Sequence, residues 1–159
     1  ARPPGPRTPT RIVLDRHLRL PLTSQLVSTA QQTPLLICHD PQADPARRAA
    51  LSAAGAECLA LPSGDQAVPT LLAELGRRRW TNLLVEGGSN VLGSFLAADR
   101  IDEVWAFIAP LLLGGATAPN PLGGSAGWGL AQAPRLHWEE VQRLGDDWLC
   151  RGRVTRPDA

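Results

Sequence analysis

The stretch that decides the fold covers residues 82–95 and reads NLLVEGGSNVLGSF. Its first four residues are Asn82 and the three apolar residues after it, and they predict a fully buried β-strand. Glu86, Gly87 and Gly88 then predict a tight turn, and residues 89–98 predict a helix. A strand, a glycine turn and a helix in this order are typical of an α/β protein, in which ligands bind beyond the carboxyl ends of strands.

The sequence before this stretch alternates in the same way. Three short apolar runs predict strands, at residues 11–15, 35–38 and 57–61. A helix is predicted between Asp44, placed as its N-cap, and Gly55, placed to end it. Residues 68–75 carry apolar side chains at the spacing of one helix face. We therefore expect a largely parallel sheet in the middle of the chain.

The sequence after this stretch has a different pattern. A strand is predicted over residues 103–110, and residues 136–144 and 148–154 flank the polar turn 145–147. This arrangement predicts an antiparallel hairpin that closes the sheet. Between the strand predicted at 103–110 and this hairpin, residues 113–134 are rich in Gly, Pro and Ala. They predict a long loop, of the kind that is often functional.

The composition is that of one globular domain. Of 159 residues, 43% are apolar and 19% are charged, which argues against a disordered chain. The net charge of +1 gives no electrostatic attraction to nucleic acid or to an anionic membrane. No apolar run approaches the roughly 20 residues that cross a bilayer. Cys38, Cys58 and Cys150 form no C-x-x-C pair, so we expect reduced, buried thiols in a cytoplasmic protein and no metal site.

The start of the helix after Gly88 is a candidate anion site. Its free amide groups and its dipole favour a phosphate or pyrophosphate, and Ser89, Asn90 and Ser94 add side-chain donors. The spacing is neither G-x-G-x-x-G nor a P-loop, so a turn that needs glycine only for steric reasons stays an alternative. Glu86 would repel a phosphate, and we assign it to a hydroxyl or an amine of a second ligand.

Several linked motifs in this order resemble the reductase domain of the bifunctional riboflavin-biosynthesis deaminase/reductase (the RibD type). The motifs are RIVLD at residues 11–15, RLP at 19–21, LVEGG at 84–88, SFL at 94–96, IDEV at 101–104, IAP at 108–110 and LLGG at 112–115. The resemblance implies an α/β, dihydrofolate-reductase-like fold that binds NADPH. It divides the chain into a linker over residues 1–10 and a reductase domain over residues 11–159.

The resemblance also implies a reaction and its site. The family reduces the ribosyl group of 5-amino-6-(5-phosphoribosylamino)uracil, a phosphorylated pyrimidine, by hydride transfer from NADPH to C1′ of the ring-opened sugar. The position of Glu86 contacts the substrate in this family. The cofactor is held by the positions of Gly87, Gly88, Ser89, Asn90, Val91, Leu92, Gly93 and Ser94. No general acid is assigned.

Two departures from the family stand out. The family's reductase begins with a segment that carries a Ser-Leu-Asp-Gly motif and supplies its first strand. Nothing in residues 1–10 matches that motif. We therefore expect the chain to be the C-terminal portion of a longer reductase, or the missing segment to lie on a separate chain or to have been cleaved away. We also expect the chain to form a homodimer or to rearrange its exposed sheet edge. The position of Arg16 is commonly a cofactor-contacting Ser, and an Arg there could pair with the 2′-phosphate of NADPH or face solvent.

Other residues receive structural interpretations. The H-x-E and P-C-x-x-C motifs of a zinc deaminase are absent, and His17, His39 and His137 are interpreted as surface or loop residues. Four tryptophans flank predicted strands and are interpreted as core or subunit-interface residues: Trp80, Trp105, Trp138 and Trp148. The run 77–79, three arginines, predicts a solvated helix end. Two other functions stay open, a structural or dimerisation fragment of this fold and a same-fold reductase for another pterin- or pyrimidine-like substrate.

Overall fold

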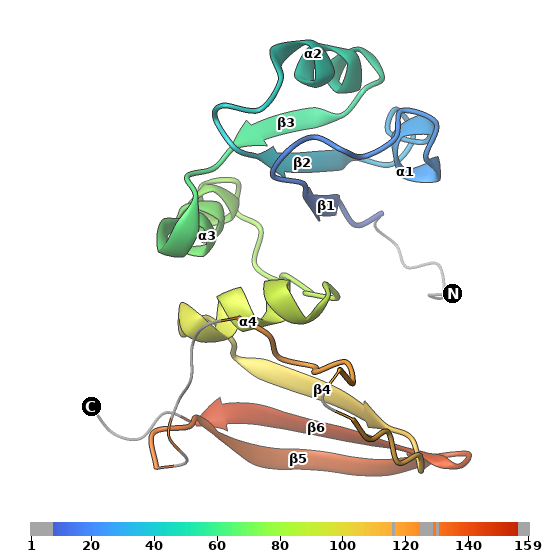
Figure 1. Cartoon of the computed structure of the whole chain (residues 1–159), viewed down its shortest axis with the longest axis vertical. Coiled ribbons are helices and arrows are strands. Elements are labelled where there is room, and N and C mark those ends of the chain that lie inside the picture. Colours follow the sequence, from blue (N-terminus) through green and yellow to red (C-terminus); the bar gives the residue numbers. More distant parts are fainter. Residues whose placement is uncertain (1–7, 116, 125–128, 130, 156–159) are drawn as a thin grey trace. The chain divides into compact units, whose positions relative to one another are not determined.

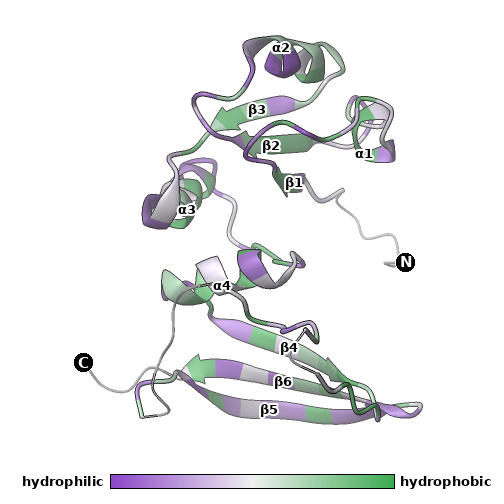
Figure 2. Ribbon diagram, viewed as in Figure 1, coloured by the Kyte–Doolittle hydropathy of each residue, from purple (hydrophilic) through white to green (hydrophobic). Residues whose placement is uncertain are grey.

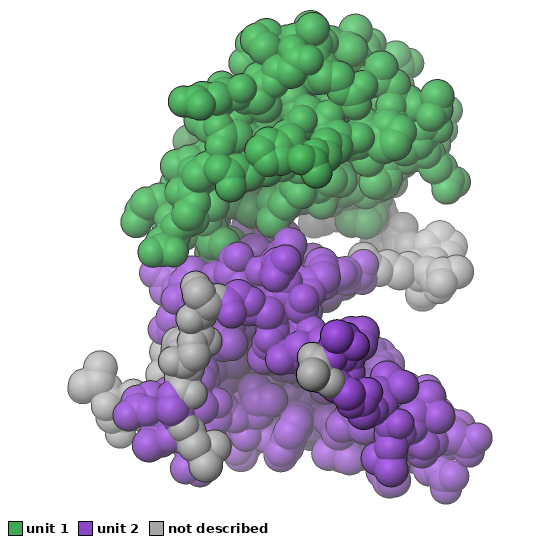
Figure 3. Space-filling model, in the orientation of Figure 1, with its two compact units in different colours: residues 1–78 green, residues 79–159 purple. Residues whose placement is uncertain are grey.

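The computed structural model describes residues 8–115, 117–124, 129 and 131–155. The chain divides into two compact units, Ala1–Arg78 and Arg79–Ala159 (Figure 3). Each unit contains one three-stranded sheet (Figure 1). Among the described residues, no helix is both long and apolar enough to span a membrane.

The first unit contains the predicted parallel sheet. Its strands are β1 (Arg11–Leu14), β2 (Leu35–His39) and β3 (Glu57–Ala60), in the order β1-β2-β3. Its helices are α1 (Gln25–Ser28), α2 (Pro45–Ala53), the short 3-10 helix η1 (Gly64–Gln66) and α3 (Ala67–Arg77). The three strands and the helices α2 and α3 that were predicted here are confirmed.

Strand β2 forms the centre of this unit because its sequence, LLICH, is buried along its whole length. It pairs with β1 on one side and β3 on the other, so both of its backbone edges are satisfied. Figure 2 shows how strongly apolar this strand is. Ile37 packs in one buried cluster with residues of the neighbouring segments: Leu18, Val27, Ala30, Leu35, Leu51 and Ala56. Burial also raises the pKa of the Cys38 thiol to about 12.

Helix α2 begins and ends where local chemistry predicts. The Asp44 carboxylate accepts a hydrogen bond from the Ala46 amide at 2.8 Å, which satisfies a donor at the helix start. Gly55 has φ = 97°, a left-handed conformation that disfavours any side chain. The chain can therefore reverse directly into β3.

The second unit contains helix α4 (Ser89–Ala97) and an antiparallel sheet. The strands are β4 (Glu103–Ile108), β5 (Arg135–Leu144) and β6 (Asp147–Thr155), in the order β4-β6-β5. Gly145, with φ = 65°, makes the turn of the predicted hairpin. A bulge between Trp138 and Glu140 shifts the register of β5 against β6. Among the described residues, the hairpin pairs with β4 through β6, and neither of its strands pairs with a strand of the parallel sheet.

The strand predicted over residues 82–85 is not formed, and that prediction was wrong. These residues belong to no sheet among the described strands, and Leu84 is 64% exposed. An apolar run favours a strand only where another strand offers backbone partners. No described strand pairs with this run, so its composition alone does not produce one.

Several predictions of burial also need correction. Trp105, Trp138 and Trp148 are about half exposed and are not core residues, whereas a subunit-interface role for them stays a prediction. His39 is buried in β2, contrary to its interpretation as a surface residue. Among the cysteines, only Cys38 is buried, and Cys58 and Cys150 are half-buried.

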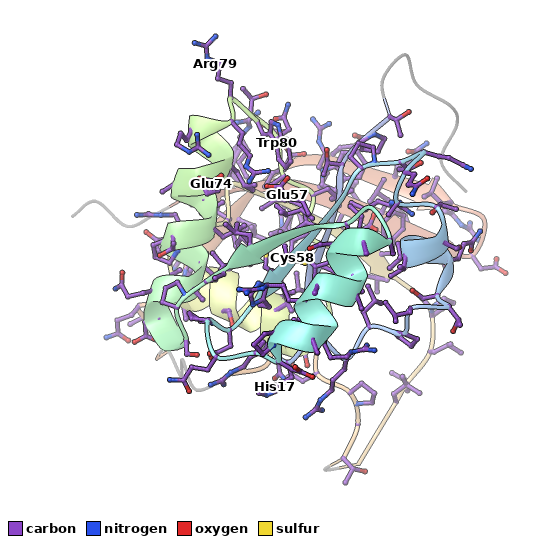
Figure 4. The ribbon with its side chains drawn as sticks, turned by 90° about the horizontal axis from the view of Figure 1, so that it is seen from above. His17, Glu57, Cys58, Glu74, Arg79 and Trp80 are labelled. Carbon is purple, nitrogen blue, oxygen red and sulfur yellow. The ribbon has the colours of Figure 1, made fainter. Side chains whose placement is uncertain are left out.

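The arginine run at the end of α3 is only partly solvated. The Arg78 side chain is 17% exposed, because it joins two carboxylates of neighbouring elements. It donates to Glu57 of β3 at 2.8 Å and to Glu74 of α3 at 2.7 Å. Figure 4 labels the two carboxylate residues, Glu57 and Glu74. Arg78 therefore ties helix α3 to the edge strand of the parallel sheet.

This cluster predicts acid sensitivity. Hydrogen bonds from Arg77, which has the larger effect, and from Arg78 lower the pKa of Glu74 from 4.5 to about 2. Because the folded chain holds this carboxylate ionised more strongly than the unfolded chain, its contribution is complete above pH 4.5 and is lost as the pH falls to about 2. We expect Glu74→Gln to flatten the fall in unfolding free energy over this range, measured by urea titration at several pH values.

Glu57→Gln removes the other carboxylate on Arg78, whose pKa the Arg78 hydrogen bond also lowers, and leaves the Arg77–Glu74 pair in place. It should therefore flatten the fall in unfolding free energy less than Glu74→Gln does. If Glu74→Gln and the unmodified chain lost stability equally over this range, the assignment to Glu74 would be wrong.

Candidate functional site

The predicted anion site lies at the start of helix α4. Gly88 is the N-cap residue, with extended backbone (φ = −67°, ψ = 175°) and no side chain to cap the helix. The amides of Val91 and Leu92 both donate to the Gly88 carbonyl, at 3.0 and 3.2 Å. The amides of Ser89 and Asn90 lie in the first turn, where a helix supplies no partner of its own. The helix start therefore offers backbone donors to an anion.

The two glycines before the helix have different roles. A Cβ on Gly87 would lie 2.7 Å from the Val91 Cβ, so this position needs glycine for packing. A Cβ on Gly88 would meet no atom within 4 Å, and its φ is one that any residue adopts. The steric alternative therefore explains Gly87 but not Gly88. The open space at Gly88 lies at the helix start, where a ligand oxygen could approach the amides.

Gly123, a described residue of the glycine-rich loop, packs on α4 in the same unit. The Gly123 amide donates to the Ser89 carbonyl at 2.9 Å, and a Cβ on Gly93 would overlap the Gly123 carbonyl oxygen. The Ser94 hydroxyl donates to the Asn90 carbonyl at 2.9 Å. Gly93 and Ser94 thus have partners within the unit, and their contact with a cofactor stays a prediction.

The remaining predicted cofactor residues lie on the same short segment. Asn90 is exposed, whereas the side chains of Val91 and Leu92 are half-buried. Glu86 is exposed and comes three residues before the helix. Because residues 82–85 form no strand, Glu86 does not stand at the carboxyl end of a strand, where the sheets of α/β proteins bind ligands. Its position beside the anion site remains.

Arg16 belongs to the first unit and lies two residues after the end of β1. Its side chain is 64% exposed, and its Nε lies 3.4 Å from Oδ2 of Asp40. The Arg16 side chain faces solvent, as one of the two alternatives for it expects, and its ion pair is with Asp40. Its contact with a cofactor stays a prediction.

Asp40 is a charged residue that the sequence argument missed. Its carboxylate accepts hydrogen bonds from the Ser63 hydroxyl at 2.6 Å and from the Gln42 amide at 2.9 Å. These bonds, together with Arg16, hold the pKa of Asp40 below its usual value. Arg16, Asp40 and Ser63 each follow one of the three parallel strands, and this shared position is the signal that could have found them.

Comparison with known proteins identifies relatives. A family model described as the RibD C-terminal domain matches residues 1–150. Riboflavin biosynthesis protein RibD of Actinobacillus pleuropneumoniae is 33% identical over 159 residues, covering 99% of this chain and 42% of that protein. The same-named protein of Bacillus amyloliquefaciens is 29% identical over 145 residues, covering 91% of this chain and 39% of that protein.

A solved structure supports the same relationship. RibD of Acinetobacter baumannii superimposes with a TM-score of 0.76 at 26% identity, over 92% of this chain and 38% of that one. The expected α/β, dihydrofolate-reductase-like fold is thereby confirmed. The chain spans about two fifths of the length of these relatives, between 38% and 42%.

The contact between the loop and α4 predicts different tolerance at neighbouring glycines. Gly93→Ala must displace the Gly123 backbone, and we expect it to lower the free energy of unfolding by about 1–3 kcal/mol, as overpacking does. Gly88→Ala enters open space and causes no overlap, so it should cost no more than about 1 kcal/mol, the usual cost of placing Ala at an N-cap. Urea unfolding of both variants measures the difference, and equal stabilities would contradict the loop contact.

Proposed function

Because the chain belongs to the RibD C-terminal domain family, we propose that it carries the NADPH-dependent reductase function of riboflavin biosynthesis. The proposed substrate is 5-amino-6-(5-phosphoribosylamino)uracil, whose ribosyl group is reduced to a ribityl group. Two relatives are named riboflavin biosynthesis proteins, which supports a role for this chain in riboflavin biosynthesis. A cytoplasmic location and a homodimer are part of the same proposal.

The single observation that carries the cofactor proposal is the open start of α4. Gly88 leaves room within 4 Å of its missing Cβ, and the amides of Ser89 and Asn90 lie in the uncapped first turn. A pyrophosphate fits this arrangement, since it is an anion whose oxygens accept several amide hydrogen bonds at once. The residues at the helix start therefore suit a pyridine dinucleotide.

The chain's own residues would bind and orient, since a nicotinamide dinucleotide supplies the hydride when it is bound. The α4 amides and the helix dipole would neutralise part of the pyrophosphate charge. The exposed Glu86 carboxylate would accept hydrogen bonds from a hydroxyl or an amine of the substrate. A carboxylate in this role fixes the sugar without repelling it, in contrast to its effect on a phosphate.

A second candidate function, a structural or dimerisation fragment, is favoured by a different observation. Large apolar side chains are exposed on β4 and just after it: Trp105, Phe107, Ile108, Leu111, Leu112 and Leu113. Exposed apolar surface of this kind is typical of a protein–protein contact. Cofactor titration separates the two functions, because a purely structural fragment would bind no dinucleotide.

The cofactor proposal predicts a charge effect at Gly88. Asp and Asn are equally good N-cap residues and nearly the same size, so Gly88→Asp and Gly88→Asn should both fold and cap α4. We expect Gly88→Asp to weaken NADPH binding at least about tenfold relative to Gly88→Asn, because only Asp adds a negative charge beside the pyrophosphate. Calorimetric titration of the 159-residue chain measures both dissociation constants.

Equal dissociation constants for the two variants would remove the anion site from α4. No NADPH binding by the folded, unmodified chain would favour the structural function. Circular dichroism of each variant verifies that its helix content is retained.

The substrate role of Glu86 gives a separate prediction. Glu86→Gln keeps the size of the side chain and removes its charge, and we expect the KM for the pyrimidine substrate to rise about tenfold, as for a lost charged hydrogen bond. The dissociation constant for NADPH should stay the same or fall slightly. Steady-state kinetics with the substrate varied tests this, and an unchanged KM would exclude the contact.

A further inference from the structure

Gly123 of the glycine-rich loop lies against the first turn of α4, within the second unit. Its amide donates a hydrogen bond to the Ser89 carbonyl at 2.9 Å. Its own carbonyl oxygen lies so close to Gly93 that a Cβ on Gly93 would overlap it. Two glycines that are far apart in the sequence thus allow two backbone segments to touch at the start of the helix.

The space beside Gly123 is occupied by polar groups of the same helix start. A Cβ on Gly123 would lie 2.9 Å from Oδ1 of Asn90, 3.1 Å from Oγ of Ser89 and 3.2 Å from the Ser89 carbonyl carbon. The two side chains can rotate away from such a Cβ, but the carbonyl carbon belongs to the helix backbone. A methyl group at position 123 would therefore lengthen the hydrogen bond to Ser89.

This hydrogen bond acts on a peptide group that also carries one of the expected anion donors. The Ser89 carbonyl and the Asn90 amide belong to the same planar peptide group, and in a helix they point in opposite directions along the axis. The Asn90 amide points out of the helix start, where the helix supplies no partner of its own. A donor at the Ser89 oxygen polarises the whole group, so it makes the Asn90 N–H a stronger donor.

We propose that Gly123 is a positioning residue for the anion site of α4. Through the peptide group of Ser89 and Asn90, it strengthens the Asn90 amide as a hydrogen-bond donor to a bound phosphate or pyrophosphate oxygen. The inference rests on the proposed function, since it concerns the anion held at α4. The coupling is reciprocal, so an anion on the Asn90 amide must strengthen the bond from Gly123 to Ser89 by the same free energy.

This reciprocity can be tested on the unmodified 159-residue chain with inorganic pyrophosphate as the probe. Pyrophosphate should shift the Asn90 amide proton downfield in the NMR spectrum, because that amide donates to it. It should also shift the Gly123 amide proton downfield, and both shifts should give the same dissociation constant. The amide of Gly145, in the hairpin turn of the same unit, is the reference and should not move.

Two variants weaken the same contact from its two sides. Gly123→Ala displaces the loop from Ser89, and Gly93→Ala displaces the Gly123 carbonyl. We expect each variant to raise the dissociation constant for pyrophosphate about threefold to tenfold, as for one weakened hydrogen bond. Each should also move the Asn90 amide proton upfield before any anion is added. Calorimetric titration measures the dissociation constants, and circular dichroism verifies that the variants fold.

Gly114→Ala is the matched control. It makes the same chemical change in the same loop, at a position where a Cβ meets no atom within 4 Å. It should leave both the dissociation constant for pyrophosphate and the Asn90 amide signal unchanged. If it weakens binding as much as Gly123→Ala does, the effect belongs to the loop in general, and the role of Gly123 is overturned.

The remaining outcomes separate this inference from the proposed function. If pyrophosphate shifts the Asn90 amide but not the Gly123 amide, the role of Gly123 is overturned while the anion site stands. The same holds if both variants fold, with lower stability but an unchanged dissociation constant, because Gly123 is then purely structural. If pyrophosphate shifts neither amide of the folded, unmodified chain and does not bind, the proposed anion site fails together with this inference. Should a variant fail to fold, the titration of the unmodified chain decides.

Discussion

Backbone pairing is the constraint on which the rest of the structure depends, because a buried N–H or C=O group without a partner is costly. Strand β2 meets this requirement on both edges and can therefore be buried along all five of its residues. The pairing with β2 fixes the positions of β1 and β3, and with them the positions of the residues that follow these strands. Residues 82–85 have a comparable apolar sequence but no described strand as a partner, and Leu84 stays exposed.

Local signals in the sequence predicted the elements that depend on local chemistry. Helix α2 begins where the Asp44 side chain caps it and ends where Gly55 adopts a left-handed backbone conformation. Both effects act within a few residues. The hairpin of β5 and β6 likewise follows from its own turn at Gly145. The predictions that failed concern contacts between residues far apart in the sequence. Arg78 looks like one of three solvated arginines until Glu57, 21 residues away, is brought beside it, and the exposure of Trp105 depends on what covers its sheet.

The candidate site shows the same division. The helix start after Gly88 was predictable, because its chemistry belongs to the helix itself. The reasons for the individual glycines were not, since Gly87 packs on Val91 and Gly93 packs on Gly123 of the distant loop, while Gly88 packs on nothing within 4 Å. Asp40 was missed because its importance comes from Arg16, and parallel pairing of β1 with β2 is what brings these two strand ends together.

The two charged features therefore differ in what they can recognise. The α4 start acts through backbone amides, which can donate hydrogen bonds to any phosphate-like anion. The positions of these amides depend little on the side chains around them. The Arg16–Asp40 pair consists of two opposite side-chain charges, and its Arg16 side chain is largely exposed, so the strength of this ion pair depends on ionic strength.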